Sequence, residues 1–334
     1  MWLILAFVSA TFLGFYDTSK KASLKDNAVL PVLLLNTIFS TVIFSPFLLD
    51  YLGGFGWFSH IDWLDPSTVF TDSQILTQTA GNTGEAGSSD KWLIFNHLSY
   101  AHPILAAHLM VILKAFIVLS SWICGYFGLK HLPLTIVGPI NATRPVIVLA
   151  GAMLFFGERL NIYQWTGVIL SILSIFLMSR AGKKEDIDFR SNRWVWCVAA
   201  ATIMGAISGL YDKFIMKSLS PMFVQSWFNF YQMIIMSVIC GLIWWPTRKQ
   251  TTPFRWRWAI PLISIFICLA DFAYFTSLND PDSMISVVSL VRRSSVIISF
   301  ICGVAIFKER NLRAKILDLI LLLTGMVFIW IGTR

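Results

Sequence analysis

The fold is decided by Gly14-Phe15-Tyr16-Asp17, a stretch that returns later in the chain as Gly209-Leu210-Tyr211-Asp212. The two copies lie 195 residues apart, and Ser23-Leu24 and Ser218-Leu219 recur at the same distance. Repetition over so long an interval indicates that the chain contains two related halves. In an apolar chain, such duplication predicts a pseudo-symmetric structure with its site between the halves.

Two further matches extend the repeat. Tyr126-Phe127, Pro133 and Arg144 match Tyr274-Phe275, Pro281 and Arg292 at an offset of 148 residues, and Gly157-Glu158-Arg159 matches Lys308-Glu309-Arg310. The offset falls because the first half has a long connection, about 50–103, where the second has a short one. We therefore interpret 50–103 as an extramembrane insertion.

The composition is that of an integral membrane protein. The chain is 56% hydrophobic and only 13% charged, and successive apolar runs are long enough to cross a bilayer. The ten predicted spans are 2–17, 28–49, 104–128, 134–156, 161–179, 194–216, 223–245, 259–277, 283–307 and 312–332. We expect an all-α integral membrane fold of ten transmembrane helices.

Five spans per half is an odd number, so the halves must lie in the membrane with opposite orientation. We predict two inverted five-helix repeats around a central cavity. The first covers 1–180, including the insertion, and the second covers 191–334.

The distribution of basic residues predicts the orientation. Of the 26 Lys and Arg residues, seventeen fall in the odd-numbered connections and five on the other side. Because basic loops stay in the cytoplasm, both termini and the 50–103 loop are predicted to be non-cytoplasmic. The expected location is the cell (inner) membrane, with multiple passes.

Five charged residues lie deep in predicted spans: Lys114, Arg144, Arg292, Arg293 and Asp271. Burying a charge at that depth costs several kcal/mol, so such residues face a polar cavity, pair with one another, or bind a solute. One aspartate cannot neutralise four cations. The surplus favours an anionic solute, and an arginine fork suits phosphate or carboxylate. The alternative is that Asp271 forms an ion pair that only joins the halves.

Polar neighbours complete the candidate substrate site. Tyr274, Asn141 and Gln232 are expected to contribute hydrogen bonds to the solute. In contrast, Asp17 and Asp212 lie at predicted span ends, where we interpret them as marking helix termini and interfacial turns. Glu158 and Glu309 precede the fifth and tenth spans, and we interpret them as favouring those helix N-termini.

No enzymatic chemistry is expected. The five cysteines fall on different spans and are interpreted as apolar packing residues. The sequence contains no convincing nucleophile–base pair, metal-ligand spacing or phosphate loop. We predict no catalytic residue, no cofactor and no metal. The expected partners are a small-molecule substrate and the lipid bilayer, without nucleic acid, and a homodimer is an open alternative for the assembly.

The chain resembles the drug/metabolite transporter superfamily and, within it, the EamA-like family. The resemblance is carried by the ten-span duplication, by the proline-bearing fourth span that ends in Phe156-Gly157-Glu158-Arg159-Leu160, and by Gln164-Trp165-Thr166-Gly167. It implies a ten-helix bundle whose cavity is lined by spans one, three, four, six, eight and nine, with five and ten peripheral. Arg292-Arg293 is similar to the basic pair with which sugar-phosphate translocators hold phosphate. The chain departs from the family in orientation, since members generally keep both termini in the cytoplasm.

We therefore expect a secondary transporter that moves a small, anionic organic metabolite by alternating access. Asp271 would pair with one basic residue in the empty state. One rival is an exporter of neutral or cationic amphiphiles, with Asp271 carrying a proton or cation. A rival of another class is a membrane sensor or scaffold whose working part is the 50–103 loop.

Overall fold

The computed structural model describes residues 1–24, 27–58, 69–70, 103–131, 140, 143–180, 192–249, 252–295 and 298, together with short pieces between 320 and 332. The predicted site residue Asn141, and most of the predicted tenth span, lie outside the described residues.

The regular secondary structure of the described residues is helical, apart from an isolated bridge between Phe70 and Leu219. The helices are α1 (Trp2–Leu24), α2 (Val29–Gly53), α5 (Pro103–His131), α7 (Arg144–Phe156), α8 (Ile162–Arg180), α9 (Arg193–Met216), α10 (Pro221–Ile239), η1 (Cys240–Trp244), α11 (Trp245–Thr247), α12 (Ala259–Asn279) and α13 (Ile285–Arg292). The π-helical turn η1 joins α10 to α11 in one continuous rod.

Within the described part of the chain, six helical segments are long and apolar enough to cross a membrane: Trp2–Leu24, Val29–Gly53, Pro103–Gly125, Arg193–Met216, Pro221–Thr247 and Ala259–Asn279. Their outward-facing side chains are apolar, as lipid contact requires; Ile4 is 68% exposed and Leu242 is 73% exposed. The protein is therefore a multi-pass membrane protein, as the composition predicts.

The predicted ends of the spans need correction in the first helix. We expected it to end at residue 17, but α1 continues to Leu24. The prediction ended the span near the first charge, Asp17. In the structure Asp17 instead lines an internal cavity, so its charge does not terminate the helix.

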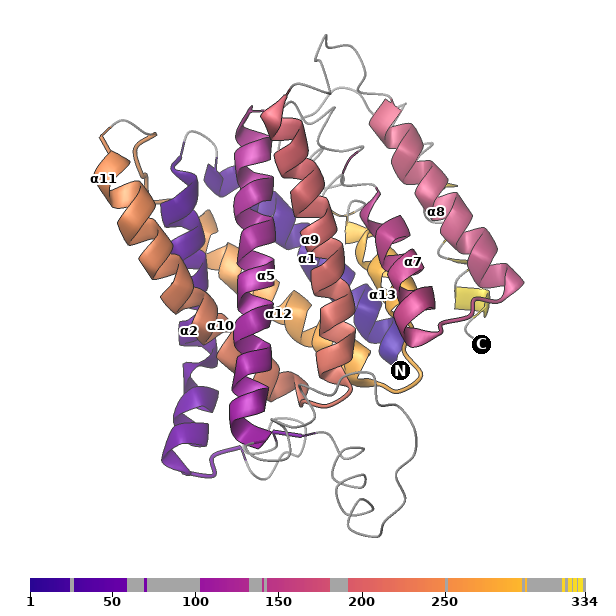
Figure 1. Ribbon diagram of the computed structural model, residues 1–334, viewed down its shortest axis with the longest axis horizontal. Helices are drawn as coiled ribbons and strands as arrows, with labels where there is room; N and C mark the ends of the chain where they lie inside the picture. The colour runs from indigo at the N-terminus through magenta and orange to yellow at the C-terminus, as the bar shows by residue number, and fades with distance from the viewer. Residues whose placement is uncertain are drawn as a thin grey trace.

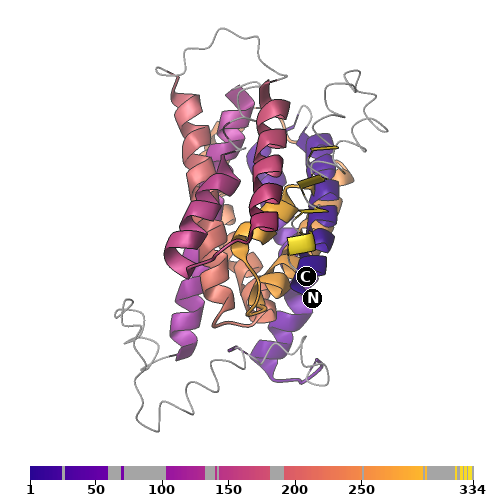
Figure 2. The ribbon, with the colours of Figure 1, turned by 90° about the vertical axis from the view of Figure 1, so that its right-hand side faces the viewer.

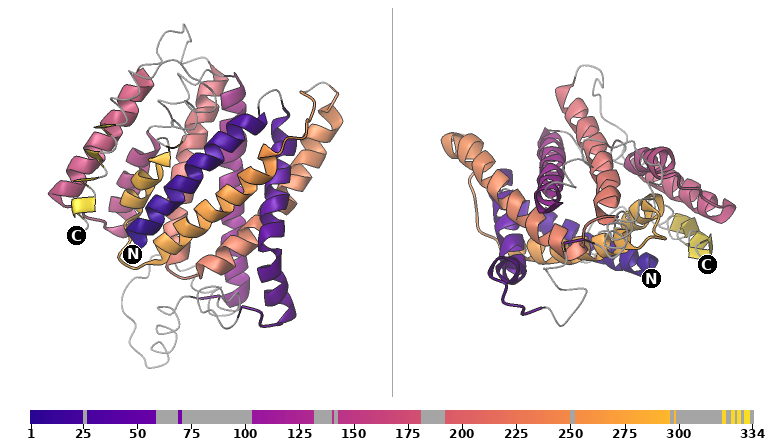
Figure 3. Two further views of the ribbon diagram at one scale, coloured as in Figure 1. Left: turned by 180° about the vertical axis from the view of Figure 1, so that it is seen from behind. Right: turned by 60° about the horizontal axis from the view of Figure 1, so that its bottom comes forward.

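The helices pack in pairs that join distant parts of the chain. The main pairs are α1 with α12, α5 with α9, and α2 with α10; α7 packs on α9 and on α13, which also contacts α1. Figure 3 shows α1 and α12 side by side along the back of the molecule. Hydroxyls hold two of these pairs: Ser9 Oγ donates to the Ala270 carbonyl at 2.6 Å, and Ser121 Oγ donates to the Ala201 carbonyl at 2.8 Å. Such interhelical bonds help association where lipid supplies no hydrophobic force.

The helices run between two faces of the bundle (Figures 1 and 2). We call the face where α1, α5 and α8 end the upper face, and the face where α2, α7, α9 and α12 end the lower face. Helix α1 rises toward the upper face, whereas α9 descends from it. The helices that carry the two copies of the Gly-X-Tyr-Asp repeat thus have opposite directions.

The lower half of the bundle is filled by apolar side chains. Val111, Met216, Leu278 and Val287 are each at most 1% exposed and belong to one continuous cluster. The cluster draws on the start of α1 and α5, the end of α9 and α12, and the start of α13.

Candidate functional site

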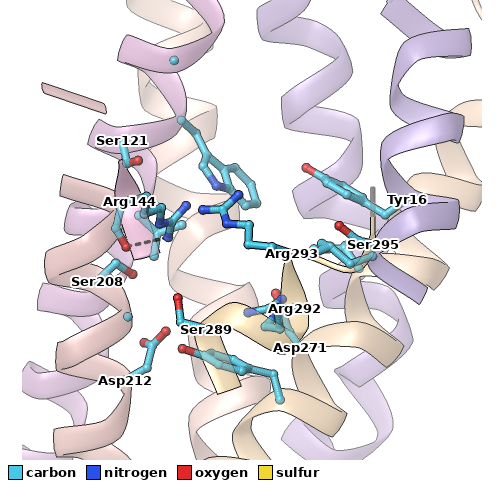
Figure 4. Close-up of a pocket in the computed structure, with 18 of the residues that line it drawn as sticks. Tyr16, Ser121, Arg144, Ser208, Asp212, Asp271, Ser289, Arg292, Arg293 and Ser295 are labelled. Atoms are coloured by element: carbon cyan, nitrogen blue, oxygen red, sulfur yellow. Dashed lines mark hydrogen bonds and ion pairs between the residues drawn. The ribbon is translucent and has the colours of Figure 1, made fainter. Parts of the chain in front are cut away.

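A cavity of about 470 Å³ lies between the helices above this core. Its lining comes from α1, α5, α7, α9, α12 and α13 and from the residues just after α13, with one side chain, Phe228, from α10. These helices correspond to spans one, three, four, six, eight and nine, the set that the family resemblance implies. The polar lining residues are Tyr16, Asp17, Lys20, Lys114, Ser121, Trp122, Arg144, Thr202, Ser208, Asp212, Asp271, Tyr274, Ser289, Arg292, Arg293 and Ser295. Figure 4 shows many of these side chains pointing into the cavity.

At the base of the cavity Lys114 forms an ion pair with Asp212. The two side chains are only 2% and 8% exposed. The Lys114 ammonium also lies 4.5 Å from the ring centroid of Phe228 and 4.3 Å from that of Phe275. We expected Lys114 to attract the solute. In the structure its ammonium group instead contacts a carboxylate and the faces of two aromatic rings.

The interpretation of Asp212 as an interfacial residue is wrong. Asp212 is 6% exposed and lines the cavity, because the last turns of α9, although they lie at the end of the span, are covered by other helices of the bundle. Asp17 occupies the corresponding place on α1 and lines the same cavity. The signal that could have identified both was the repeat itself, which places one aspartate in each half.

A second ion pair lies on the opposite wall. Arg292 Nη2 donates to Asp271 Oδ1 at 2.8 Å, and the Arg292 guanidinium stacks 4.0 Å from the ring centroid of Tyr274. The side chains of Arg292 and Asp271 are 19% and 14% exposed, so this pair borders the cavity more openly than Lys114 and Asp212 do. The structure thus gives Asp271 the arginine partner that the ion-pair alternative requires.

Arg144 and Arg293 have a different arrangement. Figure 4 shows their guanidinium groups turned toward each other across the cavity. Arg144 Nη2 donates to the Gly205 carbonyl at 2.5 Å. The close approach is possible because residue 205 has no side chain: a Cβ there would lie 2.7 Å from Arg144 Cζ.

The charges of the lining do not balance. Five basic side chains (Lys20, Lys114, Arg144, Arg292 and Arg293) face three acidic ones (Asp17, Asp212 and Asp271), a formal excess of two positive charges. Hydroxyl groups surround these charges, from Ser121, Thr202, Ser208, Ser289 and Ser295. The lining can therefore offer charged donors to an oxyanion and neutral donors or acceptors to a polar body.

The other predicted site residues lie elsewhere. Gln232 is on α10 and is 3% exposed, but it is not part of the cavity lining. Its Nε2 lacks a hydrogen-bond partner among the described residues. Asn141 falls outside the described residues, and Tyr274 lines the cavity beneath Arg292.

Glu158 caps a helix, but not the one that we predicted. The start of α8 is capped by a reciprocal pair: Asn161 Oδ1 accepts from Gln164 N at 2.9 Å, and Gln164 Oε1 accepts from Asn161 N at 3.0 Å. The Glu158 carboxylate instead accepts from the backbone N–H groups of Ile285 at 2.7 Å and Ser286 at 3.2 Å, the first turn of α13. The prediction failed because it considered only the neighbouring helix, whereas the free amides belong to the other half.

Comparison with known proteins agrees with this architecture. Residues 91–180 and 192–331 match the EamA-like transporter family. The chain belongs to this family. No curated protein sequence matches the chain significantly.

This EamA-like transporter also matches a solved structure titled only "Crystal structure of protein". The alignment covers 99% of this chain and 97% of the other, with a TM-score of 0.63 and 13% sequence identity. At that identity the likeness concerns the fold alone. Family membership and the apolar helices make the protein a membrane transporter of the drug/metabolite transporter superfamily.

Proposed function

We propose that this EamA-like transporter is a secondary transporter of a small organic anion, a carboxylate or a phosphate, in the cell membrane. The observation that carries the proposal is the pair Arg144 and Arg293, whose guanidinium groups face each other in a cavity with a formal excess of two positive charges. Like charges repel in an interior of low dielectric constant, and an oxyanion between them would relieve that repulsion. Planar guanidinium groups also match the geometry of carboxylate and phosphate.

The dimensions of the cavity suit a metabolite. Ligand pockets commonly enclose about 300–1,000 Å³, and this one measures about 470 Å³. The hydroxyl-bearing residues around the arginines favour a solute with further polar groups, such as hydroxyls, over a purely hydrocarbon acid.

The bundle comprises ten transmembrane helices in two inverted five-helix repeats, 1–180 and 191–334. Helix packing supports this part of the proposal. Exchanging spans one to five with spans six to ten turns the helix pair α1–α12 into α9–α5. The same exchange turns α7–α9 into α13–α1. All four of these helix pairs are in contact. Under the same operation α2–α10 and α7–α13 map onto themselves. A contact pattern that survives this exchange is expected when a pseudo-two-fold axis relates the halves.

Transport proceeds by alternating access, and we assign the structure to the inward-facing state, in which the cavity opens toward the cytoplasm. The lower half of the bundle is packed with apolar side chains, whereas the lining extends to Lys20, Gly125 and Ala201 in the upper halves of their helices. Basic residues in the described parts of the connections at the upper face (Figure 1), such as Arg193 at the start of α9 and Arg248 after α11, belong to the set that the positive-inside rule assigns to the cytoplasm. The termini and the 50–103 loop are accordingly non-cytoplasmic.

In the structure Asp271 holds Arg292 (2.8 Å). An arriving anion competes for that arginine, so binding stabilises an arrangement in which the Asp271 contact is released. A ligand can shift a conformational equilibrium only through such a difference in affinity between two states.

The test uses purified protein in liposomes and in detergent. Binding of phosphorylated, carboxylated and neutral metabolites is screened by thermal stabilisation, since a ligand of the native state raises its stability by mass action. Uptake of any hit is then compared for Arg144→Gln, Arg293→Gln and the control Arg248→Gln, an exposed arginine on α11's end that stacks on Trp245. Loss of anion binding in the two cavity variants but not in the control supports the proposal. Unchanged uptake of every transported anion in both cavity variants rules it out.

A further inference from the structure

Polar contacts at the lower face hold the segment that joins α12 to α13, and we call these contacts the latch. On one side Glu158, in the connection after α7, contacts the first turn of α13. On the other side Lys213, near the end of α9, contacts the end of α12 and the residues that join it to α13. Residues 280–284 and the start of α13 are thus held from two directions.

The first half of the latch replaces a missing helix cap. The N-cap residue of α13 is Met284, whose side chain makes no capping hydrogen bond. Its first amides are instead satisfied by the Glu158 carboxylate, 127 residues away in sequence from Ile285, and the Ser286 hydroxyl donates to the same carboxylate. A carboxylate at a helix N-terminus satisfies free N–H groups and complements the helix dipole. Ile285 and Ser286 are 0% and 1% exposed, so these amides have little access to water.

The second half of the latch is a buried lysine. Lys213 is 4% exposed, and its Nζ donates to the carbonyls of Leu278 at 3.2 Å and Asp280 at 3.3 Å and to the Ser283 hydroxyl. A cation is well placed there, because the last carbonyls of α12 lack intrahelical partners. Lys213 directly follows Asp212, so the latch and the cavity ion pair are adjacent on α9.

Helix α13 connects the latch to the cavity. It contains only eight residues, a length of about 12 Å at 1.5 Å per residue. The Glu158 contact lies at its first turn, whereas Arg292 and Arg293 lie at its end, inside the cavity. Val287, Val288 and Val291, between the two ends, are 0% exposed within the lower apolar core. Any tilt of α13 that opens the core must displace both the capped amides and the arginines.

We propose that Glu158 is a positioning residue and the lower gate of the transporter. Its contact with α13 holds the lower face shut and places Arg292 and Arg293 in the cavity, and the contact breaks when the lower face opens. The inference rests on the alternating-access part of the proposed function. It assigns no direct contact between Glu158 and the solute.

The experiment measures access to the closed face. A reporter cysteine is introduced by Leu278→Cys, a position that is 1% exposed on α12 beneath the latch. The detergent-solubilised protein is treated with a membrane-impermeant maleimide, and labelling is followed peptide by peptide by mass spectrometry. The variants are Glu158→Gln, which keeps the side-chain shape without the charge, and Glu158→Ala. Arg159→Gln, an exposed neighbour, is the matched control.

We expect labelling at position 278 to accelerate at least about fivefold in Glu158→Ala and less in Glu158→Gln, which retains one acceptor oxygen. The native Cys240, which is 5% exposed on η1, should label at an unchanged rate, as should every site in the Arg159→Gln protein. Equal labelling at 278 with and without the Glu158 substitutions overturns the proposal. So does a parallel rise at Cys240, because that result means general loosening rather than gate opening.

Binding in the same variants separates this inference from the proposed function. Anion affinity, measured with the best hit of the stabilisation screen or with inorganic phosphate, should fall in Glu158→Ala, because the arginines lose their fixed position. If Arg293→Gln abolishes binding while the Glu158 variants neither bind more weakly nor label faster, the anion site stands and the gate is wrong. If the gate variants label faster but Arg293→Gln leaves binding intact, the gate stands and the anion site is wrong.

Discussion

The buried pair Lys114–Asp212 allows one quantitative prediction about stability. The substitution Asp212→Asn removes the counter-charge of an ammonium group whose side chain is 2% exposed. Removing one partner of a buried ion pair costs about 3–5 kcal/mol, since the remaining charge is left uncompensated. Two phenyl rings still face the Lys114 ammonium at 4.3 and 4.5 Å. Because each such contact is favourable, we expect the lower end, about 3 kcal/mol.

The loss can be read as a shift in the thermal unfolding midpoint. An unfolding entropy of about 2.1 cal/mol/K per residue corresponds to about 0.7 kcal/mol/K for 334 residues. A loss of about 3 kcal/mol therefore lowers the midpoint by about 4 °C. The assay is thermal unfolding of the detergent-solubilised protein, followed by intrinsic tryptophan fluorescence at a fixed scan rate.

A double substitution provides the control. Replacing a buried ion pair by apolar residues of similar volume is often neutral or stabilising, so Lys114→Met combined with Asp212→Leu should recover most of the lost stability. The reasoning is refuted if Asp212→Asn alone shifts the midpoint by less than about 1 °C. It is also refuted if the double variant is as unstable as the single one, because the loss would then not come from an uncompensated charge.

Three further predictions concern single substitutions. Gly205→Ala should push the Arg144 guanidinium aside, and thus weaken anion binding about tenfold or more with little change in stability, as measured by titration and thermal unfolding. Asp271→Asn should free Arg292 and tighten anion binding about tenfold, equivalent to about 1.4 kcal/mol. If the protein instead exports cationic amphiphiles in a proton-dependent manner and Asp271→Asn abolishes that efflux, the result favours an exporter that uses Asp271 as its proton carrier. Asn161→Ala should remove the α8 cap, at a cost of about 1 kcal/mol in unfolding free energy, while anion affinity stays unchanged.

Much of the architecture could be predicted from the sequence because a bilayer imposes strict rules on composition. Apolar runs of fixed length predicted the six long helices that the structure describes. The deep charges predicted which residues meet inside: Arg144, Arg292, Arg293 and Asp271 all line one cavity. A charge in lipid is so costly that its position in a span already indicates an internal environment.

The partners of these charges could not be predicted in the same way. Asp212 lies near the end of the predicted span 194–216 and was therefore interpreted as interfacial, since the sequence alone does not show that other helices cover this end of α9. Glu158 was assigned to the adjacent helix, whereas its carboxylate meets amides 127 residues away. Gln232 shares the polar character of the site residues but lies on α10, outside the lining. Each error has one physical source: helical spacing shows which residues share a face, but not which distant helix covers it.

The pairing of α1 with α12 has a consequence for how the protein is made. Ser9 bonds to Ala270 and Ser277 bonds to Trp2, over separations of 261 and 275 residues. At a synthesis rate of about 5–20 residues per second, α1 waits on the order of 10–50 s in the membrane before its partner leaves the ribosome. During that time Asp17 has no finished cavity to face. The main packing partner of α1 is therefore made long after α1 itself, so residues 2–24 cannot complete their contacts within the first half of the chain alone.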